Sequence, residues 1–183
     1  MYVAKRLVEK GGFSKVQAAA IAGTMIDENK CNPASYMKAE AAGKGASGTR
    51  GSNRYGAGIG SWTGDYKLRV LQQSGYNPST KIETLSMDQQ IDMFIRDTQT
   101  GHKKYYDALR RCQSVEDASA TSVLITGGVG KSKNWDTHPT QEDAKRLSDW
   151  YGASNDRRFG KSPYHWNLDK RRLDYSRQVL KYL

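Results

Sequence analysis

The sequence predicts a mostly α domain with one small Gly-rich β element, and three observations support this. Apolar residues recur at three- and four-residue spacing over most of the chain, which is typical of helices with one buried face. Residues 41–64 instead hold eight of the chain's 18 glycines, a density at which no helix is stable. The chain has 183 residues, enough for one domain with a buried core, and no internal repeat or linker divides it.

Caps and breaks delimit the expected helices. An apolar stripe over residues 1–10 ends at Gly11 and Gly12, which are typical of a helix stop. Ser14 is the expected N-cap of a central helix over residues 15–29, whose alanines and glycine would let another helix approach closely. The other helices are expected over residues 66–73, 86–98, 105–112, 114–125, 140–151 and 168–182. The last two would form a basic C-terminal extension over residues 140–183 of the same single domain.

The composition limits the kinds of partner. Lys and Arg number 29 against 19 Asp and Glu, a net charge of +10 that favours nucleic acid, an anionic lipid surface or the acidic bacterial wall. The chain has no apolar run of about 18 residues and no apolar signal-peptide core near its start, so we expect neither a membrane span nor a signal peptide. Cys31 and Cys112 are expected as small buried residues, with a single disulfide as the alternative. The spacing of His and Cys predicts no metal or cofactor site.

One carboxylate has the setting of a general acid. Residues 22–33 read AGTMIDENKCNP, so a buried helix of small residues ends in Asp27 and Glu28 before Pro33 stops it. A carboxylate at a helix C-terminus faces the negative end of the helix dipole, and partial burial also favours its protonated form. Both effects raise the pKa, as a general acid requires near neutral pH. A solvated surface acid is the alternative interpretation of Glu28.

The Gly-rich segment has the features of a ligand-binding wall. Its residues at 55, 57, 59 and 61 alternate with glycines, which predicts a short strand or hairpin. Glycines would let a sugar chain lie against the backbone, and Tyr55 and Trp62 offer flat faces for sugar rings. A flexible linker and ordinary core aromatics are the alternatives.

Five segments resemble, in order, the phage tail lysozymes, relatives of goose-type lysozymes and lytic transglycosylases. DENKCNP (27–33) resembles the "ESGLNP"-like end of the family's catalytic helix, and RYGAGIGSWTG (54–64) its "YGIAQWTG"-like strand. The resemblance covers about residues 10–126. It implies an α+β lysozyme-like fold whose β-hairpin lines a glycan groove. The remaining similar segments are SKVQAAAIAGTMIDEN (14–29), SMDQQIDMFIRDT (86–98) and SVEDASATSVLI (114–125).

The resemblance implies a role for particular residues. It makes Glu28 the catalytic acid of a peptidoglycan glycosidase that cuts the β-1,4 bond between N-acetylmuramic acid and N-acetylglucosamine. Glu40 is a candidate second carboxylate or a plain surface charge, so hydrolysis and transglycosylation both stay open. Asp27 stands where the family often has Ala, and we expect it to face away from Glu28. The groove would be lined by Tyr55, Ser61, Trp62 and Thr63, with Ser61 offering a hydroxyl where the family has an amide.

The resemblance also implies a phage protein acting on the bacterial wall. We expect it in the virion tail, or in the host cytoplasm before delivery, with other tail proteins as partners. One alternative is a catalytically inactive glycan-binding or structural virion module. A nucleic-acid-binding protein is a further alternative, but no recognised reading motif supports it. TGGVGKS (126–132) is similar to a phosphate-binding loop, but no helix-forming run follows it, so nucleotide binding is not expected.

Overall fold

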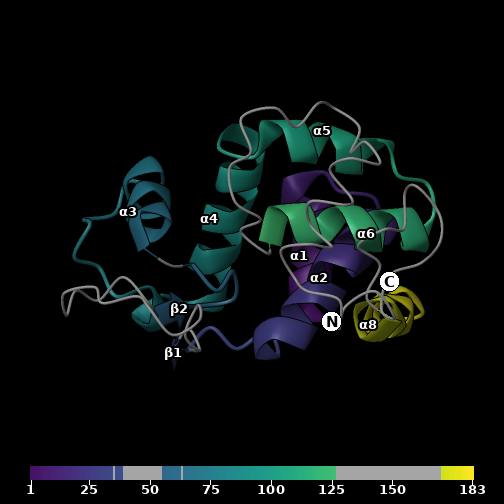
Figure 1. The fold of residues 1–183 in the computed structure, drawn as a ribbon, viewed down its shortest axis with the longest axis horizontal. Coiled ribbons are helices and arrows are strands. Elements are labelled where there is room, and N and C mark those ends of the chain that lie inside the picture. Colours follow the sequence, from purple (N-terminus) through teal and green to yellow (C-terminus); the bar gives the residue numbers. More distant parts are fainter. Residues whose placement is uncertain (35, 39–54, 63, 127–169) are drawn as a thin grey trace, which may run out of the picture.

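The computed structural model describes residues 1–34, 36–38, 55–62, 64–126 and 170–183, and it confirms a mostly helical chain. The short strands and α3 lie at one end, and α8 lies at the other beside α2 (Figure 1). The described elements are α1 (Tyr2–Gly11), α2 (Lys15–Asn29), β1 (Tyr36–Lys38), β2 (Tyr55–Ala57), α3 (Gly64–Gln73), a 3-10 turn (Ile82–Thr84), α4 (Met87–Thr100), α5 (Lys103–Arg111), α6 (Val115–Thr126) and α8 (Lys170–Leu180).

Helix α2 is the central element, and its start is the one predicted. The Ser14 hydroxyl accepts a hydrogen bond from the backbone N–H of Gln17, and the Gln17 side chain accepts one from the backbone N–H of Ser14. This reciprocal pair satisfies two of the free donors at a helix start. Every residue from 17 to 25 is buried. The small side chains of this run allow α1, α6 and α8 all to pack on α2.

The β element is shorter than expected. β1 and β2 pair antiparallel, with Tyr36 opposite Ala57 and Lys38 opposite Tyr55. Of the two predicted forms, a single strand up to Ser61 is not formed, because β2 ends at Ala57 and the chain turns back to an antiparallel bridge between Ala57 and Trp62. Gly58, at φ +68°, makes this turn possible, and a side chain there would also meet Gln90.

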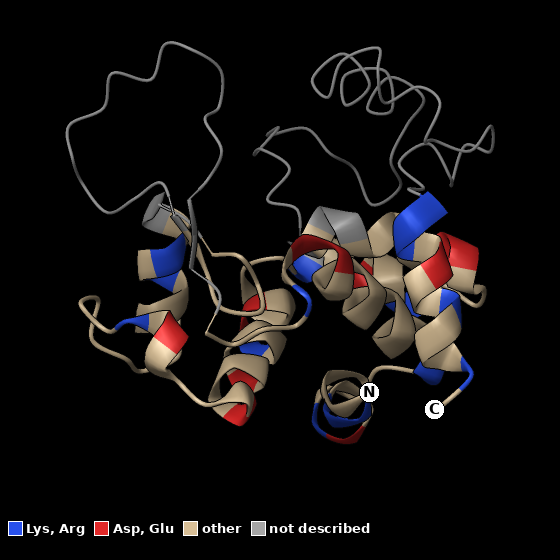
Figure 2. Cartoon of the chain, turned by 90° about the horizontal axis from the view of Figure 1, so that it is seen from below, with Lys and Arg blue, Asp and Glu red and all other residues tan. Residues whose placement is uncertain are grey.

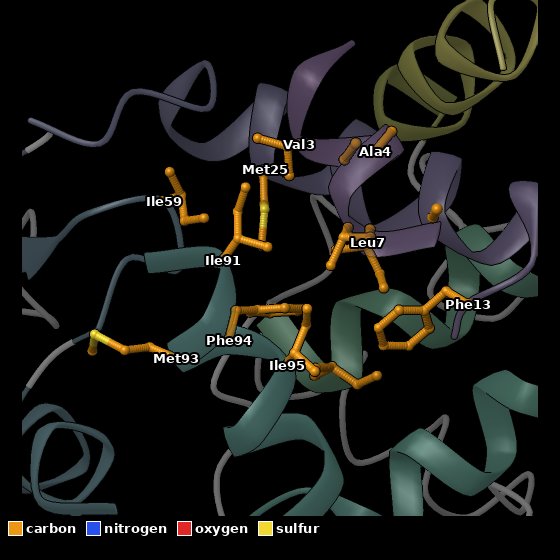
Figure 3. Packing of buried hydrophobic residues seen from close by; sticks show 14 of the residues in the cluster. Val3, Ala4, Leu7, Phe13, Met25, Ile59, Ile91, Met93, Phe94 and Ile95 are labelled. Atoms are coloured by element: carbon orange, nitrogen blue, oxygen red, sulfur yellow. The ribbon is translucent and has the colours of Figure 1, made fainter. Parts of the chain in front are cut away.

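The turn is anchored to the helical core by an apolar side chain. Ile59 is fully buried and lies beside Met25 of α2 and Ile91 of α4 (Figure 3). The same cluster continues through Leu7 and Phe94 to Phe13 (Figure 3). The Gly-rich segment is therefore attached to the core at this point, and the linker interpretation is wrong for residues 55–62.

Several other expectations can be compared with the structure. Ser86 caps α4 with the same reciprocal arrangement as Ser14, and the C-terminal helix begins at Lys170. Cys31 and Cys112 are half-buried and free, so they form no disulfide with each other. No helix in the described part of the chain is long and apolar enough to cross a bilayer. The expected helix at 140–151 and nearly all of TGGVGKS lie outside the described residues.

Candidate functional site

Glu28 lies in the last turn of α2, just before Lys30 ends the helix in a left-handed conformation. Its side chain is 16% exposed, so it is mostly but not completely withdrawn from water. Burial is the main reason that the pKa of Glu28 is raised to about 7; the nearby Arg172 opposes the rise, and the neighbouring Asp27 adds to it. A carboxyl with this pKa carries a proton in much of the population near neutral pH, which is the chemical requirement for a general acid.

The next residue fastens the end of α2 to the Gly-rich turn. Asn29 is buried, and its Nδ2 donates to the carbonyl oxygens of Gly58 at 3.0 Å and Ile59 at 2.9 Å. The same nitrogen lies 3.0 Å from the hydroxyl oxygen of Ser61, which accepts from it. The side-chain amide of Asn29 thus binds residues 58–61 to the C-terminal end of α2, next to Glu28.

A second amide holds the other side of the turn. Gln90 of α4 is fully buried, and its Oε1 accepts from the backbone N–H of Ile59 at 2.9 Å. Its Nε2 lies 2.9 Å from each of three carbonyl oxygens, those of Pro33, Ile82 and Leu85. Gln90 therefore connects the turn, the chain that leaves α2, and the segment before α4.

The carboxylate of Asp27 is held by two arginines of α8. Its side chain is 6% exposed, and its oxygens lie 2.6 Å from Nε of Arg171 and 3.0 Å from Nε of Arg172. Arg172 also places Nη2 3.4 Å from Oε1 of Glu28. The expectation that Asp27 faces away from Glu28 is therefore only partly right, because one guanidinium contacts both carboxylates.

Helix geometry gives Glu28 a defined place between two neighbours. Successive residues of an α-helix point about 100° apart. Asp27 points to α8 and Asn29 points to the Gly-rich turn, so Glu28 occupies the sector of α2 between them. Glu28 is therefore mostly withdrawn from water, and it directly precedes the residue that binds the Gly-rich turn.

The structure places the residues that were predicted to line the groove in different environments. Ser61 is beside the site, but its hydroxyl oxygen already accepts from Asn29. Trp62 is 1% exposed and packs under Gly60, so it belongs to the core, and the expected sugar-stacking role is wrong. For Tyr55 only the backbone, in β2, is described. Glu40 and Thr63 lie outside the described residues.

Three residues that shape the site had no role in the sequence prediction. Asn29 and Gln90 lie inside the segments that resemble the family, but polar side chains are not expected to be buried, so the sequence does not predict their position in the core. Arg172 lies 145 positions from Asp27, so no local pattern connects them. In the described part of the chain, no group of three His, Cys, Asp or Glu side chains is placed to hold a metal ion.

The comparison with known families matches residues 1–126 to the model of the phage tail lysozyme family. No curated protein and no solved structure matches the chain. The matched residues include α2, both strands and α6, whereas α8 lies beyond them. The family associates the chain with lysis of bacterial peptidoglycan and with the phage virion. This chain belongs to the phage tail lysozyme family.

Proposed function

We propose that the chain cleaves the β-1,4 bond between N-acetylmuramic acid and N-acetylglucosamine, with Glu28 as the general acid. The observation that supports this most is the setting of Glu28, a mostly buried carboxyl with a pKa of about 7 whose neighbour Asn29 binds the Gly-rich turn. Family membership supports peptidoglycan as the substrate. Hydrolysis of a glycoside needs such a protonated acid next to the leaving oxygen.

In the proposed reaction, Glu28 donates its proton to the glycosidic oxygen as the bond to the sugar carbon breaks. The sugar then carries oxocarbenium-like positive charge, which a nearby carboxylate can stabilise. Asp27 is poorly suited to that task because two arginines already neutralise it. Glu40 is therefore the proposed second carboxylate. Without a second carboxylate, a hydroxyl of the sugar itself attacks the reacting carbon and forms a 1,6-anhydro ring, as in transglycosylases.

The glycan chain is proposed to lie along the Gly-rich segment. Tyr55, Thr63 and the hydroxyl of Ser61 are the proposed contacts, and Trp62 supports the turn from within the core. In the described residues, Lys and Arg are spread over several helices with acidic residues between them (Figure 2). This distribution fits general attraction to an anionic wall better than one confined binding patch. In this proposal the protein works in the virion with other tail proteins.

The test is digestion of purified peptidoglycan by the wild type and by Glu28→Gln, with mass spectrometry of the soluble products. We expect Glu28→Gln to lose nearly all turnover, because its amide cannot donate a proton as an acid does. Glu9→Gln is the matched control, since Glu9 is 58% exposed on α1, and it should retain full activity. Reducing-end products identify a hydrolase and 1,6-anhydro ends a transglycosylase. Full activity of Glu28→Gln would refute the proposal.

One observation favours a second candidate, an inactive glycan-binding module of the virion. Arg172 contacts Glu28 at 3.4 Å and favours the ionised carboxylate, which cannot act as an acid. Co-sedimentation with insoluble peptidoglycan without release of soluble fragments at any pH from 5 to 8 would select this candidate.

A further inference from the structure

Helix α8 meets α2 in two successive layers. In the first, Gly23 faces Ser176 so closely that a Cβ on Gly23 would lie 2.3 Å from the Ser176 hydroxyl oxygen and 2.6 Å from its backbone nitrogen. In the second, Asp27 pairs with Arg172. Residues 23 and 27 are one turn apart on α2, as 172 and 176 are on α8. The two helices therefore run antiparallel, and the pairing at Asp27 continues the packing at Gly23.

The position of α8 is determined by more than these ion pairs. Leu173, Ser176 and Val179 are buried. The Ser176 hydroxyl oxygen lies 3.5 Å from that of Ser119 of α6, and Arg177 pairs with Glu116 of α6 at 2.6 Å. Buried apolar contacts on one face and a pairing to a second helix hold α8 in place. The base of the Arg172 side chain is consequently fixed relative to α2.

The guanidinium of Arg172 lies between two carboxylates. Its Nε is 3.0 Å from Asp27 and its Nη2 is 3.4 Å from Glu28, and its side chain is mostly buried. Within the described residues, the charged groups that face Glu28 are Asp27 on α2 and Arg172 on α8, with Arg171 reaching Asp27 from the outer side. A rigid, planar donor fork suits such a double contact, which a single ammonium group cannot reproduce.

We infer that Arg172, from a helix beyond the residues that the family model matches, is a positioning residue that holds Glu28 against Asp27 and sets the charge around the acid. The kinetic consequence rests on the proposed role of Glu28, whereas the structural consequence does not. Burial favours the protonated form of Glu28, and the positive charge of Arg172 opposes this effect. Arg172 therefore limits how tightly Glu28 holds its proton, so that the proton can be released to a leaving oxygen.

The first test follows the titration of Glu28 itself. Carboxyl carbons are observed by NMR in full-length protein from pH 4 to 10, and the Glu28 signal is assigned by its absence in Glu28→Gln. We expect Arg172→Gln to move the Glu28 midpoint upward by about one pH unit or more, since removal of an opposite charge at this distance has that effect. Arg177→Gln, which removes a charge of α8 that pairs with Glu116, should leave it unchanged. An unchanged midpoint in Arg172→Gln would overturn the inference.

The second test separates position from charge. Arg172→Lys keeps the charge but not the fork, so its midpoint should lie nearer to that of the wild type. Its kcat at optimal pH should fall at least about threefold with little change in KM, because the acid is no longer held at two points. If Arg172→Gln fails to fold, Arg172→Lys still tests whether Arg172 positions Glu28. A wild-type kcat in Arg172→Lys would overturn the positioning role.

The two arms distinguish this inference from the proposed function. If Glu28→Gln stays active while Arg172→Gln still moves the Glu28 midpoint, the function proposal fails and the effect of Arg172 on Glu28 stands. If Glu28→Gln is inactive and the midpoint does not move, only the inference fails.

Discussion

The raised pKa of Glu28 has a consequence for stability that needs no substrate. Burial raises this pKa from its ordinary value of 4.5 to about 7, so the folded protein binds a proton at pH values where the unfolded chain has released it. The contribution of Glu28 to stability is therefore greatest below about pH 4.5, falls as the pH rises towards 7, and is lower by a constant amount above 7. At about 1.4 kcal/mol per pH unit, the total loss is about 3 kcal/mol.

The variant Glu28→Gln removes this titration and keeps the size of the side chain. As the pH rises from 4 to 8, we expect the unfolding free energy of the variant minus that of the wild type to increase by about 3 kcal/mol. The assay is urea unfolding followed by circular dichroism at four or five pH values in that range, with both proteins in the same buffers. Glu28 would then have a measurable stability cost, which is common for groups that a protein keeps for function.

The control for this experiment is Glu9→Gln. Glu9 is exposed and pairs with Arg6 on the surface, so its removal should change stability by less than about 1 kcal/mol at every pH. A stability difference between wild type and Glu28→Gln that is the same at pH 4 and pH 8 would show that Glu28 titrates normally. Glu28 would then be ionised near neutral pH and could not act as a proton donor.

Three further substitutions test the parts that hold the site together. Asn29→Ala removes three hydrogen bonds to the Gly-rich turn and should lower the free energy of unfolding by about 2–3 kcal/mol. The control Asn32→Ala, at an exposed turn, should lower the free energy of unfolding by less than about 1 kcal/mol. Gln90→Met leaves buried carbonyls without a donor and should cost about 3 kcal/mol, measured by the same urea unfolding. Gly23→Ala should cost about 1–3 kcal/mol and make α8 more sensitive to limited proteolysis; unchanged cleavage would contradict the close packing described.

Local chemistry explains what the sequence could predict. The start of α2 followed from Ser14 and the small residues after it, and the placement of an acid at its end followed from the break at Pro33. These features depend on neighbours within a few positions, and both are confirmed by the structure. The end of β2 at Ala57 could not be predicted from these residues, because alternation with glycine is equally compatible with a strand and with a tight turn.

Features that depend on contacts between residues far apart in the chain could not be predicted from the sequence. The indole of Trp62 offers the same apolar area to a sugar and to a core, and only the packing of Gly60 and its neighbours decides between them. The polar side chains of Asn29 and Gln90 carry no periodic signal when they are buried. Arg172 is one of many basic residues near the end of the chain, and nothing in its surroundings relates it to Asp27.

The antiparallel pairing of α2 with α8 also affects the order in which these parts of the fold can form during synthesis. A ribosome adds about 5–20 residues per second, so α2 leaves it on the order of ten seconds before Arg172 is made. During that interval the flank of α2 at Gly23 has no covering helix, and its two terminal carboxylates lack their guanidinium partners. The C-terminal end of α2 therefore reaches its final electrostatic state only after α8 has been made.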